Sequence, residues 1–112
     1  MKLVNITAGA DGESHVQQCA LEYSERGGLA TATQAAVSVS FVSRRDGAFT
    51  DFHPAPRRQY MLYLTARVQL GLGDGSSVIM EPGDVLLAED TTGHGHTSSV
   101  LAGGLCAVVP LG

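Results

Sequence analysis

The sequence predicts a single all-β domain, and three observations lead to this fold class. Fourteen glycines in 112 residues divide the chain into short segments, a pattern that suits strands and turns better than long helices. No window of a dozen residues keeps apolar side chains at the helical spacing of i, i+3, i+4 and i+7. Several windows instead alternate with the period of two that is typical of strands. The length of the chain is that of one domain, so we expect residues 1–112 to fold as one unit.

The first half of the chain gives its strand signals unevenly. Residues 3–6 and 17–21 are candidate strands, and the Glu25-Arg26-Gly27-Gly28 segment is typical of a loop. Apolar residues alternate with serines over 37–41, which predicts a half-buried strand. The segment 60–64 is apolar on both alternating faces, so we expect a strand that is buried from both sides. In a small antiparallel domain a second subunit can cover the outer face, and this strand therefore predicts a homodimer.

The second half of the chain contains clear hairpin signals. Residues 68–72 alternate, and the Gly73-Asp74-Gly75-Ser76 segment that follows has the composition of a tight turn. Together with the apolar residues 78–80, it predicts two antiparallel strands. In Glu81-Pro82-Gly83-Asp84, proline presets φ and glycine tolerates positive φ, which predicts another turn. Further strands are predicted over 85–88, 100–101 and 105–109.

Composition limits the partners of the chain. Hydrophobic residues make up 44% of the sequence and charged residues only 16%, so we expect another subunit to cover part of the surface. The net charge of −4 lacks the basic field that phosphate backbones require, and nucleic acid is not an expected partner. No apolar run approaches the roughly 20 residues that cross a bilayer, and the first residues lack a signal peptide. We therefore expect a cytoplasmic protein that does not bind a membrane.

Two clusters of polar and ring-bearing side chains are candidates for a binding site. The first spans residues 51–60, and the second is the Glu89-to-His96 loop. Its glycines bring His94 and His96 into the same register if the segment pairs as a strand. In an extended first cluster several side chains point to one side, although Pro54 and Pro56 permit a bulge that would reset this pattern. Those side chains are His53, Arg57, Gln59, Met61, Tyr63 and Thr65. A site requires the two clusters to meet.

The order of these elements resembles the cupins, which are small jelly-roll β-barrels (double-stranded β-helices). The resemblance covers roughly residues 36–109 and is most specific at Pro82-Gly83-Asp84 followed by a late histidine. It implies a cupin-type barrel that holds a small molecule inside.

The first cupin motif maps onto the chain with substitutions. Its opening glycine falls on Gly47 and its first histidine on His53. Its second histidine falls on Ala55, its glutamate on Gln59 and its closing glycine on Ala66. The histidine of the second motif is best matched by His96, with His94 as the alternate. Two of the four metal ligands that the family uses are therefore missing, and the chain resembles a subset with a degenerate metal-binding motif.

The resemblance leaves a divalent metal (Zn, Fe, Mn or Ni) open as a cofactor. Its ligands would be His53, Gln59 and His96, three neutral groups that leave the charge of the metal uncompensated. An anionic substrate would then be needed to complete the shell. Glu89 or Asp90 would restore a carboxylate if the loop folded inward, although acidic residues after a strand are more often solvated.

The same residues also permit chemistry without a metal. Imidazole has an ordinary pKa near 6.5, so His53 and His96 can act as base and acid on opposite sides of a substrate. Arg57 and Arg58 supply positive charge for a carboxylate or enolate, and Gln59 can both donate and accept hydrogen bonds. This arrangement suits isomerisation, cyclisation or dehydration.

Some of these side chains also have a purely structural interpretation. Arg58 could form a salt bridge with Asp51, Glu89 or Asp90 instead of binding substrate. Met61 and Tyr63 are more often core than catalytic residues, although Tyr63 could donate its hydroxyl into a cavity.

The sequence therefore predicts an enzyme of the isomerase, cyclase or lyase type that acts on a small organic acid or polyketide-like intermediate inside the barrel. One alternative is a metabolite-binding cupin without turnover, and another is a metal-dependent dioxygenase. Histidines that are each locked by a carboxylate would favour the binding module. Histidines that face each other across open space would favour catalysis.

Overall fold

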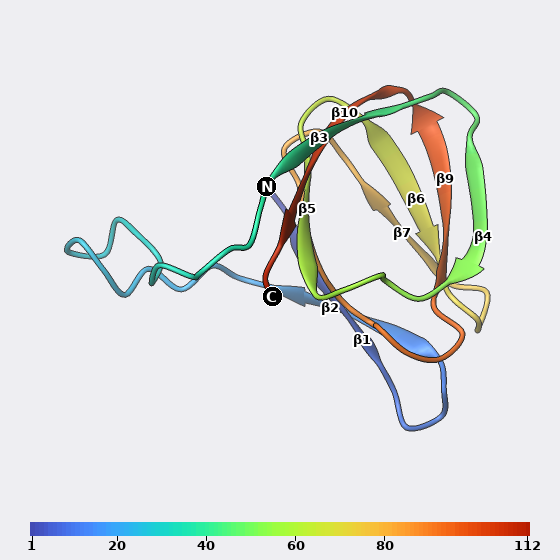
Figure 1. The fold of residues 1–112 in the computed structure, drawn as a ribbon, viewed down its shortest axis with the longest axis horizontal. Coiled ribbons are helices and arrows are strands. Elements are labelled where there is room, and N and C mark those ends of the chain that lie inside the picture. Colours follow the sequence, from blue (N-terminus) through green and yellow to red (C-terminus); the bar gives the residue numbers. More distant parts are fainter.

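The computed structural model describes all 112 residues and confirms the all-β fold class (Figure 1). The structure contains no helix long and apolar enough to cross a membrane. Ten strands run in sequence order: β1 (Leu3–Ala8), β2 (Ser14–Cys19), β3 (Ser40–Arg44), β4 (Phe49–His53), β5 (Gln59–Tyr63), β6 (Arg67–Gly71), β7 (Ser77–Met80), β8 (Val85–Glu89), β9 (His96–Ala102) and β10 (Gly104–Pro110).

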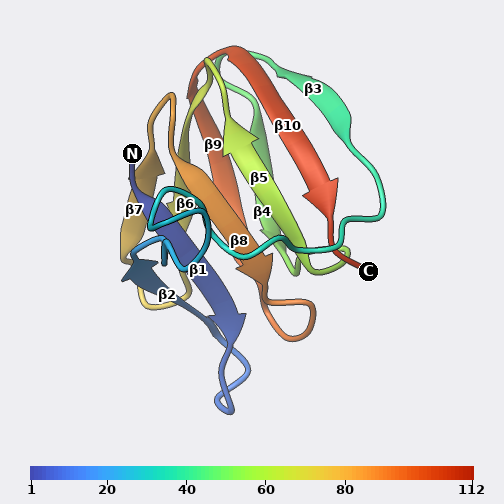
Figure 2. The ribbon, with the colours of Figure 1, turned by 90° about the vertical axis from the view of Figure 1, so that its left-hand side faces the viewer.

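The strands form two sheets that lie face to face (Figures 1 and 2). The larger sheet has the order β2-β1-β8-β5-β10-β3, and the smaller has the order β4-β9-β6-β7. Strands β1 and β8 pair in parallel, whereas all other pairs are antiparallel. Alternate side chains of each sheet point inward. Ile6 and Leu86 of the larger sheet and Val68 and Leu70 of the smaller sheet are buried in the shared core.

The predicted hairpin between β6 and β7 is confirmed. Gly71 pairs with Ser77 across the turn, and the backbone nitrogen of Leu72 donates to the carbonyl oxygen of Ser76 at 2.9 Å. Gly75 has a φ of 86°, a conformation that only glycine adopts without strain. The turn therefore needs a glycine at this position.

The predicted turn before β8 is also present, and a buried carboxylate holds it. Asp84 accepts hydrogen bonds from the backbone nitrogens of Lys2 and Glu81 and from Lys2 Nζ. Burial alone would raise the pKa of Asp84, but these hydrogen bonds outweigh it and hold the pKa below its ordinary value of 3.8. The start of β1 is thereby fixed to the start of β8.

The half-buried strand predicted over 37–41 is wrong at its start and in its burial, since Phe41 is 68% exposed. The structure begins β3 at Ser40, while Val37 and Val39 are exposed. They belong to residues 20–39, called here the arm, which runs away from both sheets (Figure 1). Within the arm only Glu25 and Ala30 form an isolated β-bridge. Alternation of apolar residues therefore marks an extended segment here, and the rest of the single chain does not bury it.

Strand β5 is fully buried at one residue only. Tyr63 on the inner face is buried, whereas Gln59 and Met61 on the same face and Tyr60 and Leu62 on the outer face are only partly buried. The expected burial on both faces is therefore not reached within a single chain.

Candidate functional site

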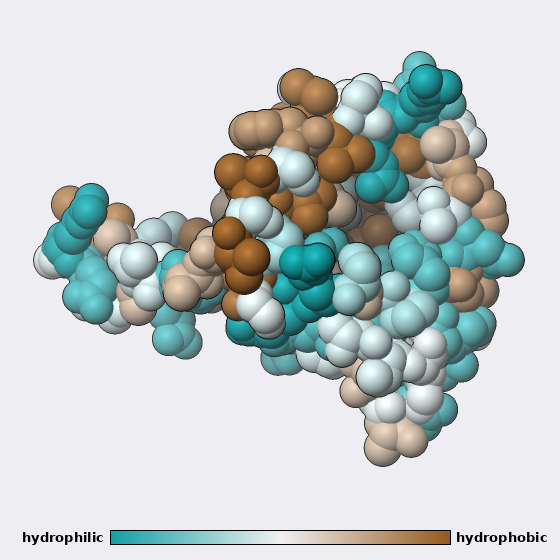
Figure 3. Space-filling model, viewed as in Figure 1, coloured by the Kyte–Doolittle hydropathy of each residue, from teal (hydrophilic) through white to brown (hydrophobic).

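The two sheets enclose a cavity of about 380 Å³, which is within the range of sites for small organic molecules. Its wall is apolar where Met61, Leu70 and Leu86 line it. Polar side chains, among them His53 and His96, line the remainder. Figure 3 shows a hollow between the sheets with an apolar floor and a hydrophilic rim.

The cavity brings together the two histidines that sequence reasoning selected. His53 ends β4 and His96 begins β9, and the two residues are register partners in the smaller sheet. Their ring centroids lie 5.2 Å apart with planes tilted by 46°. The approach depends on Gly95, which has a φ of 77°. A Cβ atom there would overlap the carbonyl carbon and oxygen of His53, so no larger residue fits.

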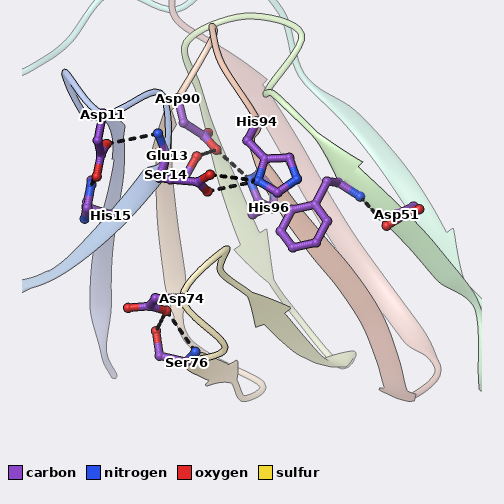
Figure 4. A network of polar contacts seen from close by, with 11 residues as sticks. Asp11, Glu13, Ser14, His15, Asp51, Asp74, Ser76, Asp90, His94 and His96 are labelled. Atoms are coloured by element: carbon purple, nitrogen blue, oxygen red, sulfur yellow. Dashed lines mark hydrogen bonds and ion pairs between the residues drawn. The ribbon is translucent and has the colours of Figure 1, made fainter.

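A buried carboxylate holds the His96 ring. His96 Nδ1 lies 2.6 Å from Asp90 Oδ2, and Ser14 Oγ donates to the same oxygen at 2.6 Å (Figure 4). Asp90 is fully buried, and its Oδ1 has no hydrogen-bond partner. Because an ionised carboxylate can only accept, Nδ1 of His96 carries the proton of the neutral ring. Nε2 is then the ring nitrogen left to act on a ligand.

The His53 ring is oriented by a backbone group. Its Nδ1 lies 2.9 Å from the carbonyl oxygen of Asp51, and a carbonyl can only accept. Neutral His53 is therefore also protonated at Nδ1 and has a lone pair on Nε2. Two imidazoles in the same tautomer thus line one cavity, where each can accept a proton or, once protonated, donate one.

Three other predicted side chains line the same cavity, namely Gln59, Met61 and Tyr63. They share the inner face of β5 because side chains two residues apart point to the same side. Burial raises the pKa of Tyr63 well above its ordinary value, which keeps its hydroxyl protonated and able to donate.

Arg57 and Arg58 are not among the residues that line the cavity. Arg58 Nε instead donates to Glu89 Oε2 at 2.6 Å, which is the structural interpretation of this arginine. The hydrogen bond from Arg58 is the main reason why the pKa of Glu89 lies below its ordinary value of 4.5. Arg57 is exposed, because the proline-containing segment 54–58 leaves the strand pattern and places Ala55 and Pro56 against the cavity.

His94 lies outside the cavity although it is two residues from His96. Its Nδ1 contacts Glu13 Oε2 at 2.9 Å, and its ring stacks on Phe52 with centroids 3.8 Å apart (Figure 4). A common register of His94 and His96 requires the segment to pair as a strand, and this condition is not met because β9 begins only at His96. The positive φ of Gly95 turns the chain between them.

Sequence reasoning missed a cationic side of the cavity. Arg44, at the end of β3, lines it, and its Nη2 donates to Ser98 Oγ at 2.9 Å. Ser98 could have been found from the sequence, because it shares the face of His96 on β9. Arg44 could not, since its place depends on how β3 pairs with β10.

The residues present do not fit a divalent metal centre. Of the proposed ligands, only His53 and His96 are ordinary metal donors, and Gln59 offers a neutral amide. No carboxylate lines the cavity, whereas Arg44 and Arg45 do. Asp90 does fold inward, as a carboxylate ligand for a metal would have to, but its Oδ2 is already hydrogen-bonded to His96. No group of three or more His, Cys, Asp or Glu side chains is arranged to hold a metal ion.

Comparison with known proteins assigns no family to the chain. No protein-family model matches it, and a search of curated proteins finds no match. The interpretation of the site therefore depends on its own geometry.

Proposed function

We propose that the chain is a small cupin-type enzyme that binds a small organic acid in the cavity and catalyses proton transfer with His53 and His96. The observation that carries the proposal is the pair of adjacent imidazoles, with centroids 5.2 Å apart and planes tilted by 46°, that line one cavity. The reaction would be an isomerisation, a cyclisation or a dehydration, because each needs one proton removed and another supplied.

The cupin assignment within this proposal is supported by the positions of four residues. His53, Ala55, Gln59 and His96 fall on the four ligand positions of the family motifs, with Ala55 and Gln59 as substitutions, and all four line the cavity. Two facing sheets are also what a jelly-roll fold requires.

The two imidazoles have distinct roles in this proposal. His96 is the stronger candidate for the base, because Asp90 orients its ring and stabilises the imidazolium that forms when Nε2 takes a proton. His53 lies beside His96 on the same sheet and, in its protonated form, donates a proton to a neighbouring atom of the substrate. Tyr63 can donate a hydrogen bond to an oxygen that gains negative charge. General acid–base catalysis of this kind contributes about 10²- to 10⁴-fold to a rate.

The alternative of a metabolite-binding module without turnover has less support. It requires each histidine to be locked by a carboxylate, but only His96 has one, and His53 is bonded to the Asp51 carbonyl. The donor set of the cavity gives the dioxygenase alternative no support, and no step of the proposal uses a metal.

Hydrogen–deuterium exchange tests the proton-transfer step without the physiological substrate. Pyruvate, 2-oxobutyrate, phenylpyruvate and acetoacetate are incubated with the protein in D₂O, and loss of the signal of the acidic C–H is followed by ¹H NMR. We expect the wild-type protein to accelerate exchange of at least one acid about tenfold or more over buffer. His96→Gln and His53→Gln should each return the rate to the buffer value, whereas His94→Gln, outside the cavity, should not.

Two results would contradict the proposal. One is a wild-type rate equal to buffer across all four acids, and the other is full activity in both cavity variants. Thermal melting of each variant shows whether a lost rate reflects lost folding.

We further propose that the chain works as a homodimer formed through the outer face of the larger sheet. A groove of about 600 Å³ lies between the arm and this face, with Leu3, Leu21, Leu62 and Val85 in its lining. The arm carries exposed apolar side chains, such as the 83% exposed Leu29, and none of its residues belongs to the hydrophobic core. A second copy supplies the same arm and the same face, so one two-fold axis would cover both.

Light scattering after size-exclusion chromatography tests the dimer. The wild-type protein should run at twice the mass of the chain, and Leu62→Asp should run as a monomer, because a carboxylate would be buried at the interface. Leu101→Asp, on β9 of the other sheet, is the matched control and should stay dimeric. A wild-type monomer at micromolar concentration would contradict the proposal.

A further inference from the structure

One side of the cavity carries positive charge without a counter-ion. Arg44 and Arg45 both line it, and neither lies within ion-pair distance of a carboxylate. No aspartate or glutamate is among the 17 lining residues, although the whole chain has a net charge of −4. The acidic groups of the protein are thus kept out of this cavity.

Arg44 is the better placed of these two cations. Its side chain is partly buried, whereas Arg45 is exposed. The hydrogen bond from its Nη2 to the buried Ser98 Oγ fixes one side of the guanidinium. The other N–H groups of the planar fork remain for a ligand, and such a fork binds carboxylates in a bidentate manner.

The position of Ser98 sets the distance from this cation to the histidines. Ser98 and His96 point to the same face of β9, two residues apart, which is about 7 Å along a strand. A ligand whose anionic end lies on Arg44 beside Ser98 would reach towards the two imidazoles. Leu70, the register partner of Ser98 on β6, and Leu86 of the opposite sheet add apolar lining to the cavity.

We propose that Arg44 anchors the carboxylate of the ligand, so that the cavity takes a small monocarboxylic acid with an apolar body. The identification rests on the proposed function, since it uses the same cavity, but it concerns recognition and not turnover. An apolar wall favours a carboxylate on an apolar body over the strongly hydrated phosphate ion. Inorganic phosphate is therefore included in the test as the competing anion.

Isothermal titration calorimetry with benzoate, benzamide and inorganic phosphate tests the anchor. Benzamide has nearly the shape of benzoate but no charge. We expect wild-type protein to bind benzoate at least about tenfold more tightly than benzamide or phosphate. Arg44→Gln should weaken benzoate binding about tenfold or more. Arg44→Lys keeps the charge without the planar fork, so its affinity for benzoate should lie between those of the wild-type protein and Arg44→Gln. Arg57→Gln, outside the cavity, should bind benzoate like the wild-type protein.

Several results would overturn the anchor. They are no benzoate binding by the wild-type protein, equal affinity for benzoate and benzamide, tighter binding of phosphate, or unchanged affinity in both Arg44 variants. Thermal melting checks that these variants are folded.

Failure of the anchor can be told apart from failure of the proton-transfer proposal. His96→Gln should lose the exchange activity while benzoate still binds through Arg44. If benzoate binds in this way but no acid is exchanged, the anchor stands and the chain is a binding module.

Discussion

The four histidines divide into an inner and an outer pair, and three of them make nearly the same contact. His96 meets Asp90 at 2.6 Å, while the outer His15 and His94 meet Asp11 and Glu13 at 3.0 and 2.9 Å. The side chains of the inner contact are 8% and 0% exposed, and those of the outer contacts are between 39% and 57% exposed. Figure 4 shows these three contacts together.

The difference shows that burial, more than the ring–carboxylate distance, separates the contact of His96 from those of His15 and His94. In water an exposed pair stabilises the fold by less than about 1 kcal/mol. In the core the same contact excludes water and fixes one tautomer, and its loss leaves a polar group unpaired. The buried contact between His96 and Asp90 therefore holds its ring in place more firmly than the exposed contacts of His15 and His94 can.

The largest effect is expected from Gly95, which separates outer His94 from inner His96. Gly95→Ala adds a Cβ that overlaps the His53 carbonyl, and we expect it to destabilise the fold by about 4 kcal/mol. Gly75→Ala is the matched control, because Gly75 has a similar φ of 86° but open space around it. It should cost only about 1 kcal/mol. Urea unfolding measures both losses of stability, and equal losses would contradict the close approach of Gly95 to the His53 carbonyl.

The second largest effect compares the inner and outer carboxylates. Asp90→Ala leaves Ser14 and His96 without their shared acceptor, and we expect a loss of about 3 kcal/mol in the free energy of unfolding. Glu13→Ala, at the partly exposed outer pair, should cost less than about 0.5 kcal/mol. Chemical denaturation at pH 7 measures both losses. If Asp90→Ala destabilised the fold as little as Glu13→Ala, burial would not distinguish the His96–Asp90 contact from the His94–Glu13 contact.

The smallest effect concerns Glu89, which neighbours Asp90 but pairs with Arg58 at the surface. Arg58 lowers the pKa of Glu89 below 4.5, so this ion pair stabilises the fold above that pH. The stabilisation is lost as the pH falls through the lowered pKa. Arg58→Gln should cost about 0.5 kcal/mol at pH 7, because the side chains are 48% and 29% exposed and solvent screens them.

The measurement is thermal unfolding of the wild-type protein and Arg58→Gln between pH 7 and pH 3. The difference between them should shrink at the acid end. A difference that grows below pH 4 would contradict the assigned sign.

The sequence allowed prediction of features that depend on neighbours along the chain. The Gly73-to-Ser76 hairpin and the inward face of β5 follow from local turn chemistry and from period-two alternation. His53 and His96 could be paired in advance only through the resemblance to cupins. Contacts between residues that are distant in the sequence were missed. Ser14 lies 76 residues from Asp90, and no local pattern connects them.

The prediction that Arg57 faces the cavity shows another limit. Counting alternate residues from His53 assumes an unbroken strand, but the structure ends β4 at His53 and starts β5 at Gln59. The intervening prolines donate no backbone hydrogen bond, so the alternation is reset. Arg44 takes the place in the cavity that the sequence suggested for Arg57.

The most direct test of the account is the tautomer of the two inner rings, read from long-range ¹H–¹⁵N NMR spectra at about pH 8, where ordinary imidazoles are neutral. The account predicts that His53 and His96 are both protonated at Nδ1 and bare at Nε2. His15, whose Nε2 contacts Asp11, should show the opposite tautomer and serves as an internal reference. A proton on Nε2 of either inner ring would break its bond to Asp51 or Asp90 and contradict the proposed site.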